Sequence, residues 1–391
     1  MSAATTVASP RRPPPWRDVR VLRWTFQAIF LLLVALFLLY LYDNLVTNLR
    51  ELGIRTDFRY LRQPAGFTIP DSDFSSSQSL FQALLVGIEN TAKVSFLGIV
   101  LATILGIVVG VARLSPNWLV RKAAGAYVET LRNIPVLVII LFWWLAVLLR
   151  LPPIRTAADW EVAVVSNRGL VGPGLDQTGS LGLFLIVAAI GLAAAVAVGI
   201  WRTRRFDRTG EPHHRVLWGG GVLVAALVVA FFVSGQPLGL SLPERGELAT
   251  TGGFRLSPEY TALLIGLTLY TASHIAEIVR GAILSVSRGQ TEASDGLGLS
   301  GFQRLRFVVL PQAFRISVPP MANQYLNLVK NSSLGVAVAY PEITRITDIT
   351  IGQGGPAPQA IFVLMLAYLM FSLGISAITN FVNRRLTLKG R

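Results

Sequence analysis

Cysteine is absent from the 391-residue sequence, and histidine occurs only three times, as His213, His214 and His274. Without cysteine the chain has no disulfides, no thiol catalysis and no cysteine-ligated metal site. Three histidines argue against a histidine-rich metal centre. Charged residues make up only 14% of the chain, which is too few to cover a soluble domain of this length.

Catalytic patterns are missing as well. The sequence contains no Gly-x-x-x-x-Gly-Lys-Ser/Thr phosphate loop, so the chain by itself is not expected to hydrolyse ATP. It also lacks a paired-carboxylate, metal-ligand or Ser/His/Asp arrangement. These absences argue against an enzyme and leave the abundant hydrophobic residues, 52% of the chain, to be explained.

The hydrophobic residues are gathered in long runs. The first run, residues 24–42, has no charged residue and would be roughly 28 Å long as a helix, close to the ~30 Å of a hydrocarbon core. It is too long for a signal peptide and lacks a small-residue cleavage site, so we expect a retained helix. Seven more apolar stretches follow, at residues 80–112, 124–149, 181–201, 216–233, 259–287, 319–340 and 360–383. The sequence therefore predicts an all-α integral membrane protein with about eight transmembrane helices.

The distribution of charge predicts the orientation. Eight spans place both termini on one side of the membrane. With both termini in the cytoplasm, the inner segments contain the cluster from Arg202 to Arg215 and the basic loop from Arg280 to Arg315, whereas the outer segments contain most of the acids. This distribution follows the positive-inside rule. The net charge of +14 is thus explained by orientation and membrane lipid, and no nucleic-acid partner is expected.

One cytoplasmic loop, residues 288–318, is longer than a connection between two spans needs to be. Gly296 and Gly298 interrupt it, and apolar residues then recur at three- and four-residue spacing. The pattern predicts two short helices separated by a glycine break, with apolar faces that must be buried outside the membrane core. Periodicity alone slightly favours an interfacial helix lying on anionic lipid.

The spacing within this loop resembles the EAA loop of ABC importer permeases. That pattern is Glu-Ala-Ala, three residues, Gly, nine residues, Ile, one residue, Leu-Pro. Here it is carried by Glu292, Ala293, Ser294, Gly298, Val308, Leu310 and Pro311, with Gly289 just before it. Ser294 and Val308 depart from the pattern but change size and polarity little. The resemblance implies a coupling helix that docks in a groove of a separate ATPase, so ATP and Mg²⁺ would be bound by that partner and no cofactor by this chain.

Further segments are similar to the polar amino acid uptake family of these permeases. They are residues 90–95, 132–135, 276–282 and 330–334, in the second, third, sixth and seventh of the eight spans. The likeness implies a type I importer core of five helices, with both termini inside. The two inserted spans and the length of the chain resemble the larger permease of general L-amino acid importers. Those systems combine two related permeases, two ATPase copies and a periplasmic binding protein at the bacterial inner membrane.

This resemblance implies a division of the chain into five parts. They are a disordered cytoplasmic tail (1–20), an extra first helix with a periplasmic loop (21–79), the first part of the permease core (80–149), an insertion with two spans and periplasmic loops (150–258), and the second part of the core (259–385). The coupling loop, 288–318, lies in the last part.

Small residues recur at every fourth position of the second span, as Gly98, Ala102, Gly106 and Gly110. Such a stripe allows another helix to approach closely, so it predicts a packing face and no metal or ligand site. Near the outer end of this span, Glu89 and Lys93 are four residues apart. We interpret them as an ion pair, although charges at membrane depth are also functional candidates.

Two later spans carry polar residues at membrane depth, namely Glu277, Arg280, Asn323, Asn327, Lys330 and Asn331. The last four share one helical face that cannot be directed at lipid, because unsatisfied donors there would cost several kcal/mol. This face is expected either to pack against a partner helix or to line a water-filled path. In a path, Lys330 and its neighbours would bind the carboxylate of an amino acid and Glu277 its ammonium group. A salt bridge between Glu277 and Arg280 is an equally good interpretation.

Three classes of function are compatible with a chain of this kind. A gradient-driven secondary amino acid transporter should show inverted repeats and interrupted helices, and neither is evident in the sequence. A membrane enzyme should show a catalytic constellation, which is missing. The prediction is therefore an ABC permease subunit, without enzyme activity of its own, that moves polar or a broad range of L-amino acids from periplasm to cytoplasm.

Overall fold

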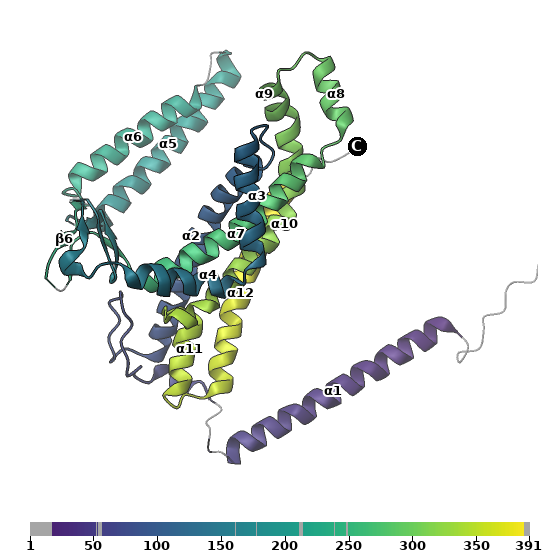
Figure 1. Cartoon of the computed structure of the whole chain (residues 1–391), viewed down its shortest axis with the longest axis vertical. Helices are drawn as coiled ribbons and strands as arrows, with labels where there is room; N and C mark the ends of the chain where they lie inside the picture. The colour runs from purple at the N-terminus through teal and green to yellow at the C-terminus, as the bar shows by residue number, and fades with distance from the viewer. Residues whose placement is uncertain are drawn as a thin grey trace, which may run out of the picture.

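The computed structural model describes residues 18–51, 53, 57–160, 162–176, 178–210, 214–237, 239–247 and 249–386. The predicted tail, residues 1–20, lies almost wholly outside the described residues. Long helices dominate the rest (Figure 1). They are α1 (Val19–Glu51), α2 (Leu80–Ala112), α3 (Trp118–Asn133), α5 (Leu181–Thr209), α6 (Arg215–Val233), α7 (Pro258–Leu284), α10 (Leu310–Asn331) and α12 (Ala357–Leu386). Shorter helices are α4 (Val136–Leu141), α8 (Arg288–Gly296), α9 (Gly301–Arg304) and α11 (Ile343–Gly352).

Six of these helices are long and apolar enough to cross a membrane, namely α1, α2, α5, α6, α7 and α12. A bent pair of helices, residues 118–133 and 136–150, brings the number to seven if it is counted as one broken span, and the chain bends by 106° between its two parts. The predicted continuous span at 124–149 is therefore wrong, and Ile134 and Pro135 lie between the two helices. The break falls at Ile134, which adopts an extended backbone before Pro135 because proline disfavours the helical conformation of the residue preceding it.

The seventh predicted span, residues 319–340, corresponds to α10, which has different limits and is not among the helices apolar enough to cross a membrane by themselves. We expected residues 319–340, but the helix begins at Leu310 and ends at Asn331, and a 3-10 segment, Ser332–Val338, follows. A π-helical turn, Leu305–Val309, joins α9 to α10 without a break. Leu310 and Pro311 are the first residues of α10 and follow the π-helical turn directly.

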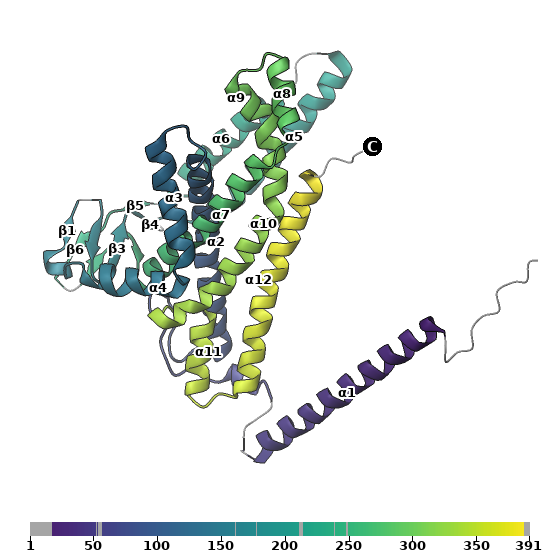
Figure 2. The same ribbon diagram turned by 45° about the vertical axis from the view of Figure 1, so that its right-hand side comes forward.

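Helix α7 lies at the centre of the bundle and packs on α2, α10, α3 and α4. Its start is defined by Ser257, whose hydroxyl accepts a hydrogen bond from the Tyr260 amide, and by Pro258 in the first turn. Leu263, Leu267 and Ile275 of α7 are fully buried in the main apolar cluster. Helix α1 lies apart from this bundle in both views (Figure 2).

The outer segments are more ordered than loops. Antiparallel strands pair in the order β1 (Ala158–Asp159), β2 (Val164–Ser166), β3 (Gly169–Gly172) and β8 (Phe254–Leu256). Two further pairs are β4 (Gly174–Asp176) with β5 (Gly239–Ser241) and β6 (Glu244–Arg245) with β7 (Thr250–Thr251). Sequence reading missed these strands because each has only two to four residues. Within the predicted loop 43–79, Tyr60, Ile69 and Phe74 are buried against α2, α11 and α12.

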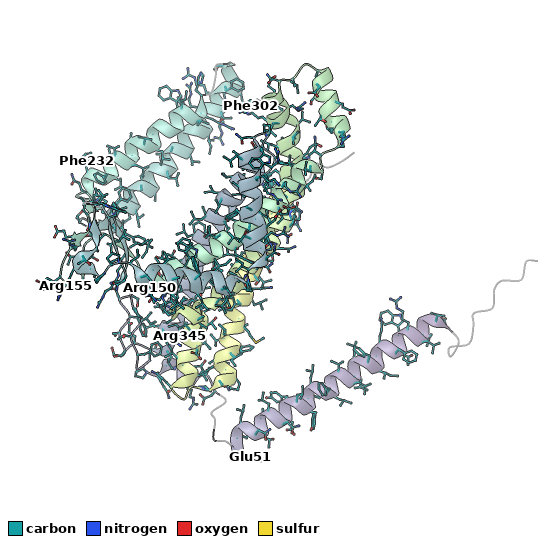
Figure 3. The ribbon with its side chains drawn as sticks, viewed as in Figure 1. Glu51, Arg150, Arg155, Phe232, Phe302 and Arg345 are labelled. Carbon is teal, nitrogen blue, oxygen red and sulfur yellow. The ribbon has the colours of Figure 1, made fainter. Side chains whose placement is uncertain are left out.

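The arrangement in space agrees with the sidedness that charge predicts. Helices α8 and α9, the end of α5, the start of α6 and the end of α12 lie toward one end of the molecule (Figure 1). Figure 3 shows Phe302 of α9 at this end and Arg345 of α11 toward the opposite one. The predicted cytoplasmic segments of the main bundle and of the α5–α6 hairpin therefore lie toward one end, whereas the start of α1 lies away from it, and α11 belongs to the outer half (Figure 1).

Candidate functional site

The coupling loop consists of α8, a four-residue break and α9. Helix α8 ends because Gly298 adopts a left-handed conformation with φ of 72°, and the amides of Leu297 and Leu299 donate to the carbonyls of Ala293 and Ser294. Helix α9 begins at Ser300, whose hydroxyl and Gln303 form a reciprocal capping box. Local capping hydrogen bonds therefore determine where α8 ends and where α9 begins.

Two contacts join α8 to the helices that follow it. Arg304 of α9 donates to the Asp295 carboxylate over 2.5 Å, and the Gln312 side chain of α10 donates to that of Gln290 over 3.2 Å. Ser294, which stands where the family pattern has alanine, is 2% exposed, and its hydroxyl donates to the Thr291 carbonyl. The substitution is tolerated because that hydroxyl is satisfied within its own helix.

The opposite face of the loop is open. Gly289, Glu292 and Ala293 are exposed, and the apolar side chains of Leu297 and Phe302 are 79% and 69% exposed. The Glu292 carboxylate has no hydrogen bond or ion pair in the part of the chain that the structure describes. Apolar side chains beside an unpaired carboxylate form a surface suited to docking a protein partner.

The polar face of α10 is directed away from the chain's own bundle. Asn323, Asn327 and Lys330 are exposed and Asn331 is half-buried, whereas the opposite face, including Leu328, is packed in the main cluster. The Lys330 ammonium forms no ion pair among the described residues. This face is therefore available to a second subunit or to a hydrated path.

Glu277 has a different environment. Its carboxylate accepts hydrogen bonds from Arg113 at the end of α2 and from Arg280 Nε at 3.2 Å on its own helix. Arg113 Nη2 also lies 3.8 Å from the Glu129 carboxylate of α3. The Glu277–Arg280 pair was expected, but Arg113 is 164 positions away in the chain and was missed. Together these charges tie the inner ends of α2, α3 and α7.

The structure does not bring Glu277 to Lys330. Leu328, near Lys330, packs at the level of Leu264 of α7, since both side chains lie next to Gly98 of α2. Glu277 is thirteen residues further along α7, or about 20 Å at the rise of an α-helix. One amino acid is too short to place its carboxylate at Lys330 and its ammonium group at Glu277.

The stripe of small residues on α2 lies against α7. All four of its members are buried, and a Cβ added to Gly106 would lie 2.6 Å from the side chain of Ile275. A Cβ added to Gly110 would lie 2.7 Å from the Ala276 carbonyl oxygen. On the outer part of the same helix, Glu89 and Lys93 form an exposed ion pair of 2.8 Å.

Sequence reasoning also missed Glu342, a fully buried carboxyl in the turn before α11. It accepts hydrogen bonds from the backbone amides of Thr344 and Arg345, each at 2.9 Å, and from the Tyr368 hydroxyl at 3.1 Å. Burial raises the pKa of this carboxyl above its usual range, which outweighs the opposing effect of the hydrogen bonds. Its position one residue before an apolar helix was the available signal, because acidic residues cap helix starts.

Comparison with known proteins gives consistent matches. Residues 216–388 match the family described as "Binding-protein-dependent transport system inner membrane component". The chain is 38% identical over 372 residues to the general L-amino acid transport system permease protein AapQ of Rhizobium johnstonii, covering 94% of this chain and 92% of that protein.

Two other relatives match over nearly the whole chain. A putative amino-acid ABC transporter permease of Escherichia coli K12, YhdX, is 38% identical over 374 residues, covering 94% of this chain and 95% of that protein. The glutamate/glutamine/aspartate/asparagine transport system permease BztB of Rhodobacter capsulatus is 37% identical over 410 residues, with 96% of each chain covered. The inserted helices α5 and α6 therefore lie inside the matched length.

Proposed function

The chain belongs to the family of amino-acid ABC transporter permeases, and we propose that it is the membrane-spanning subunit of an importer carrying L-amino acids from periplasm to cytoplasm. As a member of this family it is a multi-pass inner-membrane protein. The observation that carries the proposal is the coupling loop, a capped pair of helices with an exposed face at the inner end of the bundle.

A separate ATPase supplies the energy in this proposal. Glu292, Leu297 and Phe302 are directed outward and would enter a groove of that partner, while Asp295–Arg304 and Gln290–Gln312 hold the loop against α9 and α10. Motion of the ATPase would then pass to α10 through the π-helical turn, because no loop separates α9 from α10. In this proposal the partner ATPase binds ATP and Mg²⁺.

The complex that we propose contains a second, related permease, two copies of the ATPase and a periplasmic binding protein. The second permease is supported by the exposed polar face of α10, which must be covered from lipid. A broad or polar amino-acid range is supported by the relatives, one named for general L-amino acids and one for glutamate, glutamine, aspartate and asparagine.

The substrate path lies along the polar face of α10 in this proposal. Lys330 and Asn327 would bind the substrate carboxylate, and the second permease would complete the site. Glu277 is not part of the proposed substrate site. Two arginines already bind its carboxylate, and it lies too far from Lys330 for one amino acid to contact both side chains. A gradient-driven transporter is not favoured, because the relatives are permeases of ABC systems.

The test of ATPase docking is Glu292→Arg, which reverses a charge on the exposed face of α8. We expect the variant chain to insert normally but to retain little ATPase on purification and to lose substrate-stimulated ATP hydrolysis in proteoliposomes. Asp207→Arg, an equal change at an exposed position of α5 on the same side of the membrane, serves as the control. Unchanged assembly and hydrolysis in Glu292→Arg would refute the docking role, and uptake driven by an ion gradient without nucleotide would refute the importer.

A further inference from the structure

The inner ends of α5 and α6 carry a strong concentration of positive charge. Among the described residues of 202–215 the acidic side chain is Asp207, against five arginines, Arg202, Arg204, Arg205, Arg208 and Arg215. The coupling loop does not use these residues, and α5 and α6 form a hairpin beside the main bundle (Figure 1). The positive-inside rule explains which side of the membrane these arginines occupy, but not why Arg204 and Arg215 lie around one space between the two helices.

A hollow of about 370 Å³ lies between the two helices at this end. Its lining consists of Val196, Gly199, Ile200, Thr203, Arg204 and Arg215. Val196, Ile200, Arg204 and Arg208 follow at four-residue intervals, so they form one stripe of α5 that changes from apolar to basic toward the cytoplasm. Gly199 leaves the space open, because no atom lies within 4 Å of where its Cβ would be.

Two tryptophans indicate the depth of this hollow in the membrane. Trp201 and Trp218 are each 56% exposed, on α5 and α6. The Arg202 guanidinium lies 5.5 Å from the Trp218 ring centroid, and that of Arg205 lies 5.8 Å from the Trp201 ring. Tryptophan is enriched at the boundary between hydrocarbon and headgroups. The hollow is therefore at headgroup depth, with its apolar wall toward the hydrocarbon.

We propose that this hollow binds an anionic phospholipid of the inner leaflet, with the phosphate between Arg204 and Arg215 and an acyl chain along Val196 and Ile200. Basic pockets between membrane helices on the cytoplasmic side are suited to anionic headgroups. Free phosphate would use the arginines but not the apolar wall, so the lining favours a lipid. Arg202 and Arg205 are stacked on tryptophans and add to the local positive potential.

Two variants test the site by different means. The double variant Arg204→Gln/Arg215→Gln removes the proposed phosphate ligands, whereas Gly199→Leu fills the hollow and leaves every charge in place. The control, Arg384→Gln/Arg385→Gln, removes two charges from the inner end of α12. Each full-length chain, purified in detergent, is titrated with phosphatidylglycerol, phosphatidylethanolamine or inorganic phosphate, and the thermal unfolding midpoint and the lipid retained in native mass spectra are measured.

We expect phosphatidylglycerol to raise the unfolding midpoint of the wild type, and phosphatidylethanolamine and phosphate to have no effect. Apparent affinity for phosphatidylglycerol should fall about tenfold in both test variants, and the control should bind like wild type. If both test variants bound phosphatidylglycerol as tightly as the wild type does, the proposal would be overturned. An equal loss in the control would show general charge attraction instead of a site, and equal protection by phosphate would show an ion site instead of a lipid site.

Discussion

Two glycines one turn apart on α2 determine how closely that helix approaches α7. Gly106 leaves room for Ile275, and Gly110 leaves room for the backbone of Ala276. A backbone atom cannot move aside as a flexible side chain can, and Ile275 is itself fully buried. Neither position can therefore accept a methyl group without separating the two helices.

Gly106→Ala should reduce the free energy of unfolding by about 1–3 kcal/mol, the usual cost of overpacking a core. The matched control is Gly98→Ala on the same face of α2, where the added Cβ would meet Leu328 at an ordinary contact distance of 3.4 Å. Thermal unfolding midpoints of the detergent-solubilised chains measure the difference. Equal midpoints for the two variants would contradict the close packing of α2 on α7.

Glu342 is a second residue whose role depends on its surroundings. Because its pKa is raised above the ordinary value of 4.5, the folded chain holds this proton more tightly than the unfolded chain does. The contribution of this group to stability is therefore present below the ordinary pKa and declines as the pH rises toward the raised one.

Glu342→Gln should become progressively more stable relative to the wild type as the pH rises from about 5 to about 8, because glutamine does not titrate. Its amide oxygen still accepts a hydrogen bond at the start of α11. Glu342→Ala removes the cap altogether and should lose about 1 kcal/mol. Unfolding midpoints across this pH range test both effects, and parallel curves for wild type and Glu342→Gln would argue against a raised pKa.

At the scale of elements, the glycine break between α8 and α9 determines the direction of the coupling helix. Gly298 occupies a left-handed conformation that costs other residues about 1–2 kcal/mol. Gly296, two positions earlier, is an ordinary helical residue with open space around it. The two glycines therefore have different physical roles despite their proximity in the sequence.

Gly298→Ala should misplace α8 and reduce substrate-stimulated ATP hydrolysis in the reconstituted complex severalfold. Gly296→Ala should leave hydrolysis unchanged, since alanine suits a helical position better than glycine. Both variants insert an identical methyl group into the same loop, so the comparison isolates backbone conformation. Equal activity in the two would mean that the direction of α8 is unimportant for coupling.

At the scale of the whole molecule, the chain exposes a polar helix face that belongs at membrane depth. Asn323, Asn327 and Lys330 are not covered by any of the residues that the structure describes, whereas the exposed residues in the middle of α12, such as Leu369, are apolar and suited to lipid. The polar face is therefore expected to line water or a second permease, while the apolar face of α12 is expected to contact the bilayer.

Because the native chain has no cysteine, a single introduced thiol can be labelled without background. Asn327→Cys in the assembled transporter should react with a membrane-impermeant thiol reagent, with protection by substrate, whereas Leu369→Cys should not react. Lys330→Ala should reduce uptake more than it reduces assembly. Equal losses of uptake and assembly, together with an unreactive thiol at residue 327, would favour a purely structural role for this face.

Much of the molecule could be predicted from local patterns. Apolar runs reveal the spans because a helix must be apolar for about 20 residues to cross the hydrocarbon core. The arginines indicate which side of the membrane each loop faces, and the spacing from Glu292 to Pro311 carries the family resemblance on which the proposed coupling loop rests. The predicted limits of α10 were less accurate than those of the other helices, because its asparagines and prolines weaken the apolar pattern of the sequence.

By itself, then, the sequence determined the membrane class, the orientation and the family resemblance, because each depends on residues close together in the chain. Only the tertiary structure decided that Arg113 meets Glu277, that Glu342 is buried beneath α12, and that Glu277 and Lys330 lie too far apart for one substrate. It also placed Arg204 and Arg215 around a single hollow. Such contacts depend on how distant helices pack, and no local pattern of residue types records that packing.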